Sequence, residues 1–155
     1  MEVEVVEVKP QLVLGVRERG HYKKIAELIP KACRYADSKG LKITGAPVFL
    51  CHEMTKEQAV KADSEGTADI EIAVPVSERR EDEGDFRFYE LPGGTMAKIV
   101  HKGPYDQCEP TYKRLFQWIH ENGKKITGPL REVYANDPRE VKPEEIETEI
   151  YAPIA

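Results

Sequence analysis

The sequence has 155 residues, of which 40% are apolar and 33% charged, and its net charge is −5. This composition fits one soluble globular domain, and it holds neither a run of about 18 apolar residues that would span a bilayer nor a signal peptide at the start. Because both segments are missing from the sequence, we expect a cytoplasmic protein with no membrane partner. The acidic balance and the scattered Lys and Arg residues argue against direct nucleic-acid binding.

Cysteine and histidine usage gives no sign of a disulfide framework or a metal site. The three cysteines are Cys33, Cys51 and Cys108, an odd number with no two close in sequence. The four histidines are dispersed as well, and none shares a metal-ligand spacing with another. We therefore expect reduced thiols, no metal and no cofactor.

The sequence contains an internal duplication. When it is slid against itself by 83 positions, residues 2–45 fall on residues 85–128 without a gap, and after one length change the match resumes at an offset of 78. A duplicated half-domain normally packs on its copy about a pseudo-twofold axis, so the seam is a natural place for a cleft. The period is too long and the copy number too low for a solenoid.

In chain order, the first half predicts strands at 2–8 and 12–18, a helix that ends before Gly40, a strand at 47–52, a polar loop at 53–68 and a strand at 69–76. The second half predicts strands at 86–91 and 96–101, a helix at 111–122, a strand at 131–136, a loop at 137–146 and a strand at 147–154. Lys9-Pro10 and Pro92-Gly93-Gly94 are expected to be hairpin turns. Because proline is tolerated in the first turn of a helix, we expect the main helix of the first half to begin near Pro30.

These elements predict an α+β fold. A curved antiparallel sheet carries two helices on one face, and a central cleft lies on the other side. We expect a single domain over 1–155 with halves at about 1–78 and 84–155, joined by the charged linker 77–85.

Candidate binding residues follow from strand parity. Glu71 and Glu149 are equivalent in the two copies and fall on the strand face that the apolar residues leave free. If Tyr134 looks into the cleft beside Glu149 and Tyr151, the site has aromatic walls and a carboxylate, which suits an amphipathic cation. Alternating Glu and Ile is also typical of any half-exposed strand, so a solvated surface role for Glu71 stays open.

Structural roles are open for the other aromatic residues. Tyr112 and Phe116 are spaced as core residues of the second helix. Tyr35 and Trp118 either pack a helix against the sheet or line the edge of the cleft, and packing is the preferred interpretation. Tyr105 follows a glycine at the entry to that helix, where a structural role and a ligand contact are both open.

The second half carries the motifs of a known family. They are Tyr89–Gly94 (YELPGG), His101–Tyr105 (HKGPY), Trp118-Ile119 with Asn122-Gly123, Gly128-Pro129 with Glu132–Pro138 (EVYANDP), and Thr148–Ile154 (TEIYAPI). In their order and spacing, the chain resembles the GyrI-like small-molecule-binding domain, which is also the effector-binding module of AraC-type and MerR-type multidrug regulators. The resemblance covers nearly the whole chain and implies two strand-helix-strand-strand repeats around a central ligand cleft.

The resemblance also implies a function. Family members bind amphipathic, often cationic aromatic compounds, and the usual anchor is a glutamate on the last strand, which Glu149 matches. Tyr134 and Tyr151 fall on the flanking aromatic positions, and Asn136 stands where some relatives carry a second acid. In the regulators a DNA-binding domain precedes this module, and here residue 1 already begins the first strand.

Three functions follow from this resemblance. We expect first a standalone binding protein for amphipathic, cationic aromatic compounds, with ligand contacts from Glu149, Tyr151, Tyr134, Asn136 and Glu71. The alternatives are a metal-independent hydrolase of strained alkylating compounds that uses Glu149 with Tyr134, and a gyrase-inhibitor-like role with a topoisomerase or a regulator as protein partner.

Overall fold

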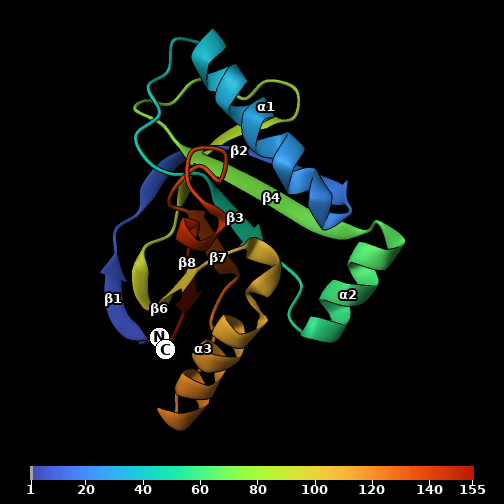
Figure 1. Ribbon diagram of the computed structural model, residues 1–155. Helices are drawn as coiled ribbons and strands as arrows, with labels where there is room; N and C mark the ends of the chain where they lie inside the picture. The colour runs from blue at the N-terminus through green and yellow to red at the C-terminus, as the bar shows by residue number, and fades with distance from the viewer. Residues whose placement is uncertain (1) are drawn as a thin grey trace. The chain divides into compact units, whose positions relative to one another are not determined.

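A computed structural model describes residues 2–155 of the chain (Figure 1). The expected α+β class is confirmed, since the described residues form eight strands and three α-helices. The chain forms two compact units, of which unit 1 holds residues 2–9 and 93–155 and unit 2 holds residues 10–92. Within residues 2–155, no helix has the length and the apolar character needed to cross a membrane.

Unit 2 consists of β2 (Gln11–Gly20), the short 3₁₀ helix η1 (Tyr22–Lys24), α1 (Ile25–Ser38), β3 (Val48–Cys51), α2 (Lys56–Glu65), β4 (Ala68–Pro75) and β5 (Phe86–Leu91). Its antiparallel strands lie in the order β3-β4-β2-β5. Helix α1 packs on β4 and β2, and this packing buries Leu28, Ala32 and Ala36 on one side of the helix.

Unit 1 consists of β1 (Glu4–Val8), β6 (Gly94–Lys102), η2 (Tyr105–Gln107), α3 (Glu109–Glu121), β7 (Leu130–Tyr134), η3 (Pro143–Glu145) and β8 (Glu147–Pro153). Its antiparallel strands lie in the order β1-β6-β8-β7. Helix α3 packs on β6, and Leu115 and Ile119 join Ile99 and Ile150 in the core of the unit.

The expected hairpins at residues 9–10 and 92–94 are wrong. Strand β1 pairs with β6, where Val6 lies opposite Met96, and β2 pairs with β5, where Leu14 lies opposite Phe88. Strands β1 and β5 are the two copies of one repeat element, and each therefore lies beside the second strand of the other copy. The two copies have similar apolar patterns, so strand propensity alone does not distinguish the two pairings.

The prediction that the first helix begins near Pro30 is also wrong. Helix α1 starts at Ile25 and contains Pro30 in its sixth position. A proline inside a helix removes one backbone hydrogen bond, but the apolar face that packs on the sheet runs through this turn from Leu28 to Ala36. Tertiary packing therefore sets where the helix begins.

The polar loop expected at 53–68 contains a third helix, so the prediction of two helices is wrong. The Thr55 hydroxyl caps α2 by accepting a hydrogen bond from the Gln58 N–H, and Gly66 ends the helix with a φ of 69°. None of its residues is buried, so the sequence lacks the apolar period that marks a packed helix. The cleft expected between the two halves of the chain stays a prediction.

Candidate functional site

Glu132 on β7 is a buried carboxylate, with 3% of its surface exposed. Three tyrosine hydroxyls donate hydrogen bonds to it. Tyr134, two residues further on, donates to Oε1 at 2.8 Å, Tyr105 of η2 donates to the same oxygen, and Tyr112 of α3 donates to Oε2. These four residues are called the Glu132 cluster below, and all four belong to unit 1.

Strand register explains why Glu132 is buried. It lies opposite Ile150 in the β7–β8 pair, and directly opposed residues of an antiparallel pair point to the same face. Ile150 packs with Leu115 and Ile119 of α3, so Glu132 points to the helix-covered face. The carboxylate therefore lies at an apolar position of the repeat and depends on the tyrosine hydroxyls for its hydrogen bonds.

The electrostatics of the cluster follow from this burial. Loss of solvent raises the pKa of Glu132 above its ordinary 4.5, and the hydroxyls of Tyr105, Tyr112 and Tyr134 act in the opposite direction. Burial, and then the nearby Glu132, raises the pKa of the Cys108 thiol to about 12. The groups that stabilise the charged form of Glu132 are thus neutral donors.

Aromatic rings connect the carboxylate to the surface of unit 1. The rings of Tyr105 and Tyr134 meet edge to face with their centroids 6.1 Å apart, and Tyr112 lies 6.0 Å from Phe116. Tyr105 is 44% exposed and Phe116 41%, so Phe116 is not the core residue that its spacing predicts. Rings around a desolvated carboxylate form the chemistry that holds an amphipathic cation.

The structure separates the residues that the sequence placed together. Tyr134 lies opposite Thr148, and Glu149 lies opposite Val133, so Tyr134 and Glu149 point to opposite faces of the β7–β8 pair. The expectation that Tyr134 stands beside Glu149 and Tyr151 is wrong because of this parity. Tyr134 belongs to the Glu132 cluster.

Glu149 and Tyr151 do lie together, beside a lysine that the sequence reading missed. The Tyr151 hydroxyl donates to Glu149 Oε1 at 2.9 Å, and Lys98 Nζ lies 3.9 Å from Glu149 Oε2 and 5.6 Å from the centre of the Tyr151 ring. The Glu149 side chain is 28% exposed. Glu149 therefore already has an internal cation close to it.

Asn136 holds the loop between β7 and β8. Its Nδ2 donates to the Glu145 carbonyl at 2.9 Å, and its Oδ1 accepts from the Glu147 N–H at 3.0 Å. Both ends of the amide are used in these contacts, and they fix the entry to β8.

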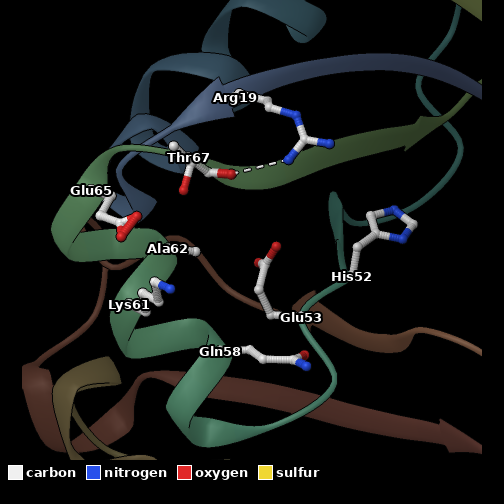
Figure 2. A pocket seen from close by; sticks show the side chains of 8 residues that line it. All are labelled: Arg19, His52, Glu53, Gln58, Lys61, Ala62, Glu65 and Thr67. Atoms are coloured by element: carbon white, nitrogen blue, oxygen red, sulfur yellow. Dashed lines mark hydrogen bonds between the residues drawn. The ribbon is translucent and has the colours of Figure 1, made fainter.

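Unit 2 has a separate hollow of about 300 Å³ beside α2 (Figure 2). It is lined by Arg19, His52, Glu53, Gln58, Lys61, Ala62, Glu65 and Thr67. Polar side chains from the end of β2, from the segment after β3 and from one side of α2 extend towards it (Figure 2).

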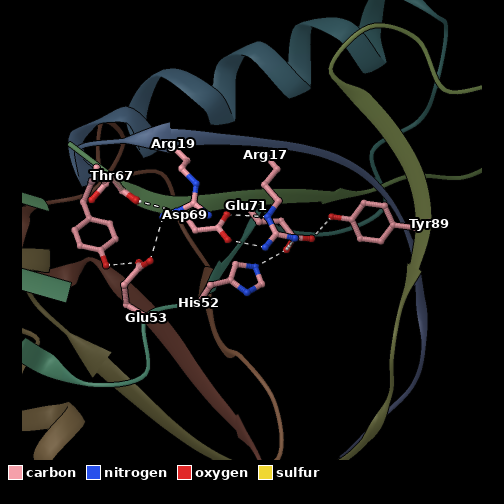
Figure 3. Close-up of polar contacts among 9 residues, drawn as sticks. Arg17, Arg19, His52, Glu53, Thr67, Asp69, Glu71 and Tyr89 are labelled. Carbon is pink, nitrogen blue, oxygen red and sulfur yellow. Dashed lines mark hydrogen bonds and ion pairs between the residues drawn. The ribbon is translucent and has the colours of Figure 1, made fainter. Parts of the chain in front are cut away.

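Glu71, the fifth predicted site residue, lies on β4 next to this hollow. Its side chain is 11% exposed, and Figure 3 shows it among Arg17, His52 and Tyr89. The Tyr89 hydroxyl donates to Oε2 at 2.5 Å, His52 Nε2 lies 2.6 Å from Oε1, and Arg17 Nη1 lies 3.7 Å from Oε1. A solvated surface role for Glu71 is wrong, because these three side chains enclose its carboxylate.

Sequence reasoning missed Glu132, Tyr105 and Tyr112 as site residues. Strand parity did place Glu132 and Tyr134 on one face, but the family pattern drew attention to Glu149. Within residues 2–155, no group of three or more His, Cys, Asp and Glu side chains is arranged to hold a metal ion.

Comparison with known proteins identifies the family. The model of the GyrI-like small molecule binding domain matches residues 1–155. The chain belongs to this family. No curated protein matches the GyrI-like chain.

Solved structures share the GyrI-like fold. The EcmrR C-terminal domain is 25% identical with a TM-score of 0.85, and the match covers 99% of this chain and 97% of that one. EcmrR in its complex with DNA is also 25% identical to this chain, with a TM-score of 0.86. The match covers 99% of this chain, which spans 57% of the length of that protein. SAV2435 bound to tetraphenylphosphonium is 14% identical with a TM-score of 0.65, over 100% of this chain and 94% of that one, and it supports the fold alone.

Proposed function

We propose that this GyrI-like chain binds amphipathic aromatic cations and that Glu132 is the anionic anchor. The observation that carries the proposal is a carboxylate buried to 97% of its surface whose charge is stabilised by neutral tyrosine hydroxyls. A cation that reaches this carboxylate gains a Coulomb attraction in a low-dielectric environment, which no internal partner in the Glu132 cluster supplies.

Ring geometry supports the aromatic part of the proposal. Tyr105 and Tyr134 place aromatic rings beside the carboxylate through their hydroxyl contacts, and Tyr105, at 44%, is an exposed member of the Glu132 cluster. Because Glu132 is covered, a ligand enters only when one of the covering rings moves. We propose that Tyr105, which belongs to the short η2, is the ring that moves.

The tetraphenylphosphonium bound to SAV2435 belongs to the same class of compound, which supports it as the first probe. Binding is measured through the fluorescence of Trp118, which packs against the core of unit 1. Glu132→Gln keeps the shape and removes the charge, so we expect the affinity to fall by about 1–3 kcal/mol, or roughly 5- to 150-fold. Tetraphenylborate has the same shape and the opposite charge, and we expect it to bind no better to the native protein than to the variant.

Glu149 with Tyr151 is the second candidate anchor, and Lys98 distinguishes the two. If Glu149 were the anchor, Glu149→Gln would weaken tetraphenylphosphonium binding, and Lys98→Met, which frees Glu149, would strengthen it. We expect both variants to bind within about twofold of the native protein, since 0.4 kcal/mol is about the effect of a remote charge in water. Equal binding by native protein and Glu132→Gln would overturn Glu132 as the anchor.

A hydrolase remains the second candidate function. The observation that favours it is the direct contact of Tyr134 with a carboxyl group of raised pKa, a pairing suited to general acid–base chemistry. In this proposal the catalytic partner of Tyr134 is Glu132, because Glu149 lies on the opposite face of the sheet. Incubation with a strained alkylating compound tests it, and consumption that is unchanged in Glu132→Gln removes it.

A further inference from the structure

We propose that unit 2 contains a second binding site, in the hollow beside α2, for a small zwitterion that carries both an ammonium and a carboxylate group, such as a free α-amino acid. The hollow of about 300 Å³ has room for such a molecule. The site is independent of the Glu132 cluster, since all of its lining residues belong to unit 2.

Helix α2 is held in place by polar contacts. Its Asp63 accepts a hydrogen bond from the Tyr22 N–H at 2.8 Å through Oδ1, and the Asp63 carbonyl contacts the His21 ring. With the Thr55 cap, these contacts fix both ends of a helix that buries none of its own residues. A polar helix fixed in this way presents a stable face to a polar ligand.

One face of α2 points into the hollow. Lys61 and Ala62 follow Gln58 by three and four positions, and Glu65 follows them by four and three, a spacing that aligns side chains on one side of a helix. The small Ala62 in this set leaves space, and Figure 2 shows Ala62 and Gln58 on the side of α2 that is nearer to Glu53.

The opposite wall is fixed by hydrogen bonds (Figure 3). Glu53 Oε1 accepts from the Tyr22 hydroxyl at 2.5 Å, and its Oε2 accepts from the Asp69 N–H at 3.1 Å. Arg19 Nη1 donates to the Thr67 carbonyl at 3.1 Å, and the Arg19 side chain lines the hollow. Side chains held before the ligand arrives lower the entropy that binding must overcome.

The charges of the lining select a zwitterion. Arg19 and Lys61 carry two positive charges, and Glu53 and Glu65 carry two negative charges. A ligand carboxylate fits between the Arg19 and Lys61 donors, while a ligand ammonium fits a free lone pair of Glu53. A ligand that carries a charge of only one sign would be attracted by one pair of these side chains and repelled by the other pair.

The second copy lacks the helix that forms this site. In unit 1 the connection from β7 to β8 contains η3 in place of α2, and the change of offset from 83 to 78 falls in this part of the alignment. The side of the hollow that α2 forms therefore has no helical counterpart in the second copy.

Titration of ¹⁵N-labelled full-length protein with each of the 20 common α-amino acids tests the proposal by NMR. We expect at least one to shift the amides of residues 52–67 in a saturable way. Acetate and methylammonium, each with one half of the zwitterion, should bind at least tenfold more weakly. If acetate alone binds as tightly as the amino acid, or if no amino acid shifts these amides, the proposal is overturned.

Two variants of the same helix complete the test. Ala62→Leu fills the hollow without changing its charge and should abolish binding, whereas Val60→Leu, at a 60% exposed residue outside the lining, should leave it intact. Binding that survives in Ala62→Leu contradicts the proposed location. Glu132→Gln should leave amino-acid binding unchanged, so failure at one site is distinguishable from failure at the other.

Discussion

Glu132 in β7 occupies the position that Phe49 occupies in β3. Glu132 lies opposite Ile150 and Phe49 opposite Ile72, and these two isoleucines are equivalent residues of the duplicated halves. In unit 2 the Phe49 ring packs edge to face on Tyr22 at 6.1 Å, and Tyr22 is the equivalent of Tyr105. One copy thus keeps an apolar contact where the other has placed a carboxylate and tyrosine hydroxyls.

This difference between the copies bears on function. A buried carboxylate costs folding free energy that a phenylalanine at the same position does not, so stability alone gives no reason for Glu132. Selection for a charge at an apolar position agrees with the proposed role as an anchor for cations.

The affinity for tetraphenylphosphonium should depend on pH through Glu132. The protonated carboxyl group does not attract a cation. The affinity is therefore at its maximum above the raised pKa of Glu132 and falls as the pH drops through this pKa. Because burial places this pKa above 4.5, the loss should begin at a higher pH than for an exposed glutamate. Fluorescence titrations with tetraphenylphosphonium from pH 4 to 8 measure this pH dependence of the affinity.

The ligand-free protein should respond to pH in the opposite direction. A raised folded-state pKa contributes stability that is full below about 4.5 and is lost as the pH rises through the folded pKa. Glu132→Gln should weaken the pH dependence of both the tetraphenylphosphonium affinity and the free energy of unfolding. The neighbouring Tyr105, Tyr134 and Cys108 stay protonated in this range, since burial raises the pKa of Cys108 to about 12 and raises those of Tyr105 and Tyr134 as well. A binding curve that keeps its pH dependence in the variant contradicts the assignment.

Tyr134→Phe should raise the pKa of Glu132 further, because it removes a hydroxyl that stabilises the carboxylate. We expect the midpoint of the affinity curve to move to higher pH, and the free energy of unfolding at pH 7 to fall by about 1–3 kcal/mol. Urea unfolding and the same fluorescence titrations measure the two effects.

Tyr35→Phe is the matched control for this change. The Tyr35 hydroxyl bonds Glu83 at the surface, and its ring stacks on Phe86 at 3.9 Å, a contact that phenylalanine preserves. The midpoint of the affinity curve should stay in place. A shift of equal size in both variants would show that the effect does not come from the Glu132 cluster.

Gly15→Ala should disturb the contact between Tyr89 and Glu71. A Cβ atom at Gly15 would lie 2.3 Å from the Tyr89 hydroxyl oxygen and 2.4 Å from its ring, so Tyr89 must move away from Glu71. We expect a loss of about 1–3 kcal/mol in the free energy of unfolding. Gly128→Ala, whose Cβ would lie 3.6 Å from Pro153, should change it by less than about 0.5 kcal/mol. Similar losses in the two variants would contradict the steric explanation.

Apart from α2, the types of the main elements could be predicted from the sequence, and the partners of the strands could not. Apolar alternation and terminal glycines located the strands and the helix before Gly123 within a few residues. The exchange of β1 and β5 was not predictable, because a duplicated chain has two pairings of similar pattern and the short connections at residues 9–10 and 92–94 suggest hairpins.

The candidate site was predictable only in part. Parity placed Glu132 and Tyr134 on one strand face, but the sequence does not tell which face α3 covers, and this decides that Glu132 is the buried acid. Tyr112 was expected to be a core residue because of its helical spacing, and its ring does pack on the core, but the spacing does not reveal that its hydroxyl reaches Glu132. Helix α2 was missed because its face is polar.

Pro30→Ala should stabilise the protein. Pro30 is exposed and stands inside α1, where it removes the hydrogen bond that an N–H at this position would donate to the Ala26 carbonyl. The restored bond is opposed by the greater freedom of the unfolded chain, worth about 0.4–1 kcal/mol, so we expect a net gain of about 1–2 kcal/mol. Thermal unfolding followed by circular dichroism should show a melting temperature higher by roughly 2–8 °C. Glu27→Ala, an exposed change in the same helix, should shift it by less than about 2 °C, and a melting temperature that falls in Pro30→Ala would mean that the proline fits a distortion of the helix that alanine does not keep.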